Sequence, residues 1–109
     1  MIIIANRIPV NPEFHEEFEE RFQNRANLVD LMPGFVSLQI LRPMQEGDPY
    51  IIQTTWESEE HFRAWTESEE FKQGHGKGGT PPPEGMFAGK SKMEMHEIVE
   101  KKREVKQES

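Results

Sequence analysis

The chain has 109 residues, with 20 Asp or Glu against 13 Lys or Arg, and therefore a formal charge of −7. This length favours one domain with a single core, and the acidity argues against nucleic acid or an anionic membrane surface as a partner. Cysteine is absent, which excludes disulfides, thiolate metal sites and a cysteine nucleophile. No apolar run approaches the roughly 20 residues that span a bilayer, and the opening residues lack the charge of a signal peptide. We therefore expect a cytoplasmic protein.

The first elements are a strand and a helix. Residues 2–8 are rich in isoleucine and precede Pro9, which predicts a strand. Asn11 and Pro12 predict a helix start, with Asn11 as the N-cap and Pro12 at the first helical position. Phenylalanines at helical spacing and glutamates near the start support this helix, which we expect to end at residues 32–34.

A hairpin and a second helix follow. Residues 35–41 and 50–56 alternate or are rich in β-branched and aromatic side chains, and turn residues separate them. Ser58 predicts the cap of a helix that runs to about Gly74. A second cap near Ser68 would break this helix.

The last part of the chain combines a loop, a strand and a tail. Residues 74–90 are rich in glycine and proline, which is typical of a mobile functional loop such as a lid. Residues 91–99 predict a fourth strand, and residues 100–109 a charged tail outside the domain formed by residues 1–99. The fold class is therefore α+β, with the ferredoxin-like order βαββαβ.

This plan leaves one face of a four-stranded antiparallel sheet without helices. Two such faces can cover one another, as sheets do when they stack. We therefore expect a homodimer in which two domains form a dimeric α/β barrel, with a pocket between helices and sheet in each protomer.

Three residues are candidates for a site, and each has an alternative structural explanation. Asn6 interrupts an isoleucine run, where an amide is costly unless it is satisfied or functional; an edge-strand asparagine bonded to nearby backbone is the alternative. Trp65 lies at helical spacing and could simply pack in the core. His75 lies among glycines at a helix end, where it could bind a ligand or be solvated.

Four motifs and one histidine occur in a defined order along the chain: Asn6-Arg7, Pro33-Gly34-Phe35, Trp56-Glu57-Ser58, Phe62-Arg63-Ala64-Trp65 and His75. Over residues 2–99 the chain thereby resembles the haem-degrading monooxygenases of the Isd type, a branch of the antibiotic-biosynthesis-monooxygenase superfamily. The two motifs at residues 33–35 and 56–58 are shared with cofactor-free members and so indicate the fold. Asn6, Trp65 and His75 match the haem-site triad of the Isd type and are the specific part.

The resemblance implies that haem is both cofactor and substrate. O2 and an external electron donor would serve to cleave the porphyrin, with release of iron and an open-chain tetrapyrrole. His75 would be the axial iron ligand, and the Asn6 amide would donate a hydrogen bond to the other ligand of the iron. Trp65 would press against the macrocycle and direct the oxidation to a particular meso carbon.

Several charged residues are weaker candidates. Arg21 and Arg25 lie one helical turn apart and could bind haem propionates, although pairing of Glu17 with Arg21 is at least as probable on spacing alone. Arg7 and Lys77 could act in the same way.

The remaining histidines and the methionines are not expected to belong to the site. His15 and His61 are predicted to be solvated, and His96 to be a surface or interface residue. The six methionines, which include Met93 and Met95, are interpreted as adaptable packing.

Two other functions remain open. The chain could be a cofactor-free monooxygenase that acts on a quinol-like aromatic compound, with a polar pocket that does not bind haem. It could also bind haem without turnover.

Overall fold

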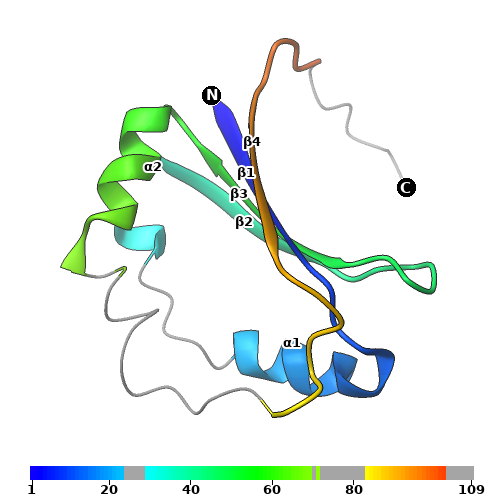
Figure 1. The fold of residues 1–109 in the computed structure, drawn as a ribbon. Coiled ribbons are helices and arrows are strands. Elements are labelled where there is room, and N and C mark those ends of the chain that lie inside the picture. The colour runs from blue at the N-terminus through cyan, green and yellow to red at the C-terminus, as the bar shows by residue number, and fades with distance from the viewer. Residues whose placement is uncertain (24–28, 70, 72–82, 103–109) are drawn as a thin grey trace, which may run out of the picture.

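The structure is a computed structural model that describes residues 1–23, 29–69, 71 and 83–102. The elements follow one another as β1 (Ile2–Ile8), a short 3-10 helix (Pro12–Phe14), α1 (His15–Gln23), a second 3-10 helix (Val29–Leu31), β2 (Phe35–Leu41), β3 (Tyr50–Trp56), α2 (Glu59–Thr66) and β4 (Lys92–Glu97) (Figure 1). The first three strands have the predicted bounds, and β4 is shorter than predicted at both ends.

The four strands form one antiparallel sheet in the order β2-β3-β1-β4. The central strand β1 pairs with β3, where Asn6 lies opposite Ile52, and with β4, where Asn6 lies opposite Met93. This confirms the predicted α+β, ferredoxin-like fold. The homodimer stays a prediction.

Both helices cover the same face of the sheet, which we call the helix side (Figure 1). Side chains alternate between faces along a strand, so Ile2, Ile4, Asn6 and Ile8 of β1 lie on the helix side. Ile3, Ala5 and Arg7 lie on the opposite face, which we call the open face. The open face carries polar side chains, among them Gln53, which donates a hydrogen bond to Gln39 at 3.3 Å.

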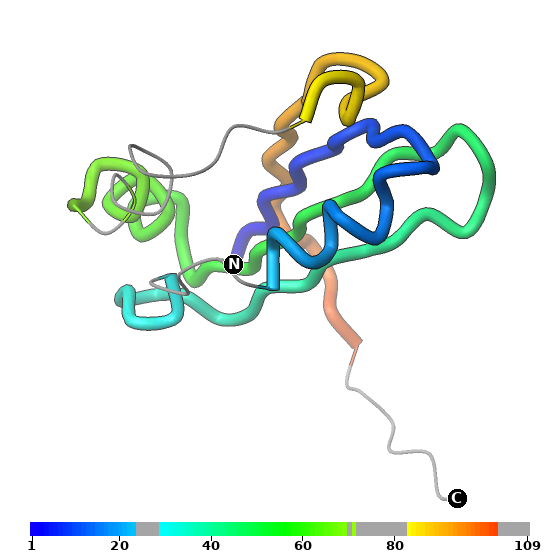
Figure 2. The backbone as a smooth tube through the Cα atoms, turned by 90° about the horizontal axis from the view of Figure 1, so that it is seen from below, coloured from blue at the N-terminus to red at the C-terminus, as the bar shows by residue number. Residues whose placement is uncertain are grey.

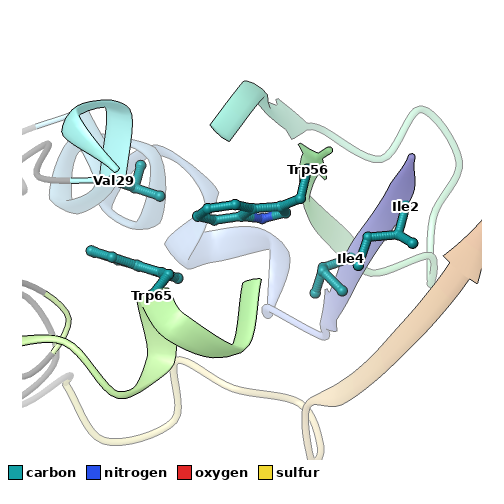
Figure 3. Packing of buried hydrophobic residues seen from close by; sticks show 5 residues of the cluster. All are labelled: Ile2, Ile4, Val29, Trp56 and Trp65. Atoms are coloured by element: carbon teal, nitrogen blue, oxygen red, sulfur yellow. The ribbon is translucent and has the colours of Figure 1, made fainter. Parts of the chain in front are cut away.

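The core consists of two separate clusters of buried side chains. The first lies under α2 and contains Ile2, Ile4, Val29, Trp56 and Trp65 (Figure 3). The second lies under α1 and contains Val10, Phe18, Tyr50, Ile52 and Met86. The two helices thus stabilise opposite ends of one sheet face, and the view from below in Figure 2 shows α1 crossing the strands far from α2.

The start of α1 differs from the prediction. Asn11 precedes the 3-10 helix but makes no side-chain cap. Its amide instead donates to the carbonyl of Gly85 at 2.5 Å. The helix itself is described only to Gln23, whereas we predict that it ends at residues 32–34. Residues 24–28 of that range lie outside the described residues, and at Val29–Leu31 the chain forms a 3-10 helix in place of the predicted α-helix.

The second helix is shorter than predicted and breaks where expected. Ser58 is its N-cap, because its hydroxyl accepts from the backbone N–H of His61 at 3.2 Å. The helix ends at Thr66. Ser68 then accepts from the backbone N–H of Phe71 at 3.1 Å, which confirms the second cap.

Residues 83–89 do not form a free loop, although the sequence predicts a mobile segment there. Met86 is 1% exposed, and its carbonyl accepts from the Asn11 backbone N–H at 2.8 Å. Phe87 forms a β-bridge with Val10. The lid predicted for residues 74–90 otherwise falls on residues outside the described part. None of the described helices is long and apolar enough to cross a membrane.

Candidate functional site

Asn6 lies on the helix side at the boundary between the two core clusters. Ile4 on the same face belongs to the first cluster, whereas Ile52, its neighbour on β3, belongs to the second. The side chain is half-buried, and within the described part of the chain its amide has no hydrogen-bond partner. Since β1 is a central strand, the alternative of an edge-strand asparagine is wrong. The amide is therefore available to a ligand on the helix side.

Trp65 is positioned by the first cluster, as the packing interpretation predicts. It is 8% exposed, and its indole stacks on Trp56 with ring centroids 6.5 Å apart and an interplanar angle of 27°. Phe71 packs edge-on against the same indole, with ring centroids 5.3 Å apart. Figure 3 shows Trp65 reaching from α2 toward Trp56 and Val29. The orientation of this indole is consequently set by neighbours on several elements.

The third member of the candidate triad, His75, lies outside the described residues, as do Arg25 and Lys77. Arg21 is described, and its Nε is 3.9 Å from Oε1 of Glu17. The predicted pairing along the helix is therefore present, and at this length it is an ion pair rather than a hydrogen bond. It leaves the proposed role of Arg21 toward propionates untested.

Arg7 points away from the helix side. Its Nε donates to Oε1 of Glu94 at 3.0 Å on the open face. This hydrogen bond, joined by Lys92, holds the pKa of Glu94 below its ordinary value. Arg7 and Asn6 therefore do not share a face, because adjacent residues of a strand face opposite sides of the sheet. The weaker prediction that Arg7 binds a propionate stays a prediction.

Two histidines predicted to be solvated are instead packed. His15 is half-buried, with Nε2 3.1 Å from the carbonyl of Val10 and its ring edge-on to Tyr50 at 5.0 Å. His61 has Nδ1 2.7 Å from the hydroxyl of Ser58. His96 is exposed, and its place opposite Ile3 puts it on the open face, as a surface residue was expected to be.

A polar cluster that no sequence motif predicts lies near the other end of the helix side. Glu19 of α1 accepts from Nε of Arg42 at 2.6 Å and from the hydroxyl of Tyr50. The hydrogen bonds from Arg42 and then Tyr50 lower the pKa of Glu19 to about 2. Burial, followed by the bond to Glu19, raises the pKa of Tyr50 to about 12.

This Glu19–Tyr50–Arg42 cluster borders a hollow of about 330 Å³, whose other lining residues are Gln23 and Ile40. The three residues come from α1, from β3 and from the position directly after β2, so no local pattern in the sequence links them. Both the acid and the phenol are held in their ordinary charge states at neutral pH. The cluster therefore ties α1 to the sheet and is not poised for proton transfer.

Known proteins are similar to this chain in sequence and in fold. The family model described as antibiotic biosynthesis monooxygenase matches residues 1–77. A heme oxygenase (mycobilin-producing) of Mycobacterium tuberculosis is 41% identical over 64 residues, which cover 59% of this chain and 61% of that protein. A heme-degrading monooxygenase of Bacillus cereus is 36% identical over 84 residues, which cover 74% of this chain and 78% of the relative.

A solved structure extends the likeness over the fold. The M. tuberculosis heme-degrader MhuD, with two hemes bound in its active site, has a TM-score of 0.77 to this chain at 30% identity, with 94% of this chain and 100% of that chain covered. This chain belongs to the antibiotic biosynthesis monooxygenase family. Within that family, its relatives include proteins named for haem degradation, which confirms the resemblance seen in the sequence.

Proposed function

We propose that this protein is a haem-degrading monooxygenase that binds haem as cofactor and substrate. It uses O2 and electrons from an external donor to cleave the porphyrin, and it releases iron and an open-chain tetrapyrrole. The observation that carries the proposal is the likeness to relatives of that activity, at 36 to 41% identity. We infer a homodimer in the cytoplasm as the working form, with residues 1–99 as the haem-binding domain.

The described residues fit a porphyrin on the helix side. A porphyrin needs apolar surface for its face and few polar contacts, and the Asn6 amide lies on a sheet face that is otherwise largely apolar. Among the described residues, no three His, Asp or Glu side chains gather to hold a bare metal ion. In haem, four nitrogens of the macrocycle already bind the iron, so the protein would need to supply only one further ligand.

The proposed roles follow from the chemistry of the side chains. When bound, haem supplies the oxygen activation and is itself the target. His75 would hold the iron through a neutral ring nitrogen. The NH2 group of Asn6 would donate a hydrogen bond on the helix side, and Trp65, fixed by Trp56 and Phe71, would present a rigid indole edge to the macrocycle. Arg21 and Arg25 would bind the propionates by charge-assisted bonds.

The test begins with a titration of the purified protein with ferric haem, followed by the Soret band, and then addition of ascorbate in air. A saturable Soret shift followed by bleaching and iron release would support the proposal. A stable shifted band would favour haem binding without turnover. No shift would favour the cofactor-free monooxygenase that acts on a quinol-like compound.

Two variants separate the roles. His75→Ala should lose haem coordination, whereas His96→Ala, which removes an exposed histidine of the open face, should bind haem normally. Asn6→Ala should bind haem and fail to degrade it. If Asn6→Ala degrades haem at the normal rate, the role assigned to its amide is wrong.

A further inference from the structure

Two methionines of the edge strand β4 lie on the helix side without being covered by the described chain. Met93 lies opposite Asn6 and Met95 opposite Ile4, so both side chains share a face with these residues. Met93 is 55% exposed and Met95 is 38% exposed. The interpretation of both as packing residues is therefore incomplete for the described part of the chain.

The neighbours of Asn6 on its two sides differ sharply in burial. Ile52, on β3, is 6% exposed beneath α1, whereas Met93, on β4, is half exposed. The same contrast holds within one residue type, because Met86 is 1% exposed in the second cluster. Coverage of the helix side among the described residues thus stops at β1, and Asn6 lies at its margin.

We propose that Met93 and Met95 form one wall of the porphyrin site and hold the macrocycle against Asn6. This inference rests on the proposed function and adds two positioning residues to it. A thioether suits this place, because methionine adapts its shape and makes favourable contacts with aromatic rings. Both methionines share a sheet face with Asn6, so the ligand that covers them is the one that Asn6 contacts.

The role is positional and involves no ligation by sulfur. Met93 lies directly beside Asn6, so its bulk limits how far the macrocycle can slide along the sheet toward β4. Met95 lies two residues further along β4, beside Ile4 of the first cluster, to which Trp65 belongs. The two methionines would therefore act with Trp65 in deciding which meso carbon faces the amide of Asn6.

Oxidation of methionine provides a direct test. Hydrogen peroxide transfers one oxygen atom to a thioether, which gives the sulfoxide and water, and mass spectrometry measures this at each methionine. The full chain is treated with peroxide in the dark, with and without zinc protoporphyrin, which is redox-inert under these conditions. Met44, on the β2–β3 connection, is 98% exposed and serves as the reference for a freely accessible methionine. Met86 serves as the reference for a buried methionine.

We expect zinc protoporphyrin to slow oxidation of Met93 and Met95 several-fold and to leave the rate at Met44 unchanged. A Soret shift on addition of the porphyrin, with unchanged oxidation of Met93 and Met95, would overturn this inference and leave the proposed function standing. Absence of any Soret shift, with zinc protoporphyrin or with haem, would overturn both.

A pair of charge variants gives an independent readout. Met93→Glu should weaken haem binding at least several-fold, because a carboxylate would be buried against the macrocycle, whereas Met44→Glu should bind haem normally. Met93→Ala should bind haem and change the ratio of cleavage products. Since Met93 is half exposed, none of these changes should shift the thermal unfolding midpoint appreciably. Equal affinity and equal product ratios in the Met93 variants would contradict the positioning role.

Discussion

Gly34 lies directly against the imidazole ring of His61, so that a Cβ added at Gly34 would overlap Cγ of the histidine. Gly34 also has a φ of +81°, a conformation that other residues rarely adopt. Its carbonyl accepts from the backbone N–H of Glu57 at 2.8 Å. The two sequence motifs at residues 33–35 and 56–58 are thus parts of one contact, in which His61, held by Ser58, requires glycine opposite.

We predict that Gly34→Ala destabilises the protein by about 2–4 kcal/mol, from steric overlap together with the positive φ. Gly47→Ala is the matched control, because Gly47 has a φ of +92° and no atom within 4 Å of the added Cβ. It should cost only about 1–2 kcal/mol. Urea unfolding measures both, and equal losses would mean that the overlap with His61 is relieved easily. The double variant Gly34→Ala, His61→Ala should recover the difference.

Acid stability should depend on Glu19. Its folded-state pKa is about 2, against an ordinary value of 4.5, so its contribution to stability is present above about pH 4.5 and is lost as the pH falls toward 2. Glu19→Gln should therefore lower the urea midpoint at pH 7 and flatten the loss of stability at acid pH. Glu20→Gln, at an exposed position of the same helix, should leave that loss unchanged. An acid profile of Glu19→Gln identical to that of the parent would contradict the assignment.

Tyr50 is the single tyrosine of the chain, so absorbance of its phenolate can be followed without ambiguity. We expect it to titrate near pH 12 in the folded protein, above the ordinary value of 10. Since the folded pKa is the higher one, this stabilisation is complete below pH 10 and is lost as the pH rises toward 12. Arg42→Gln should raise the pKa of Glu19, because the hydrogen bond from Arg42 is the main cause of its lowering, and should therefore reduce the stability that Glu19 contributes at neutral pH. Titration of Tyr50 at its ordinary pKa in the folded chain would show that neither the burial of the phenol nor its bond to Glu19 holds in solution.

Trp65 needs a conservative variant, because it is buried against Trp56 and Phe71. Trp65→Ala should cost about 3–5 kcal/mol of stability, so a loss of activity in that variant would not separate packing from function. Trp65→Phe should remain folded, bind haem and give altered product ratios. Normal rates and normal products in Trp65→Phe would assign the residue to packing alone. The readouts are a thermal melt and chromatography of the products.

The strands and the overall order of elements could be predicted because each strand carries its own local pattern and the turns between them are marked by glycine and proline. The two histidines that were expected to be solvated show where such patterns stop being informative. His61 packs against Gly34, which lies far before it in the sequence. His15 packs against Tyr50, on another element. Contacts between elements decide burial, and a local pattern does not contain them.

The candidate site also combines features that follow from a local pattern with features that depend on contacts between elements. That Asn6 and Arg7 face opposite sides follows from the alternation of a strand and could have been derived from the sequence. The helices cover only part of the helix side, and Asn6 lies at the margin of the covered part. Both features depend on the pairing of β1 with β3 and β4 and on where the helices end. The exposure of Met93 and the Glu19–Tyr50–Arg42 cluster depend on the same long-range arrangement.

The anchoring of Phe71 and Met86 has a consequence for how this protein can vary. Phe71 packs against Trp65 in the first cluster, and Met86 is buried in the second, so the segment that carries His75 is fixed at both ends to independent parts of the core. The entropic cost of closing a loop rises only by about 0.6 kcal/mol for each doubling of its length. Insertions and changes of glycine or proline content between these two anchors can therefore accumulate at little cost in stability, and natural variation can reshape the surroundings of His75 without changing the sheet that carries Asn6.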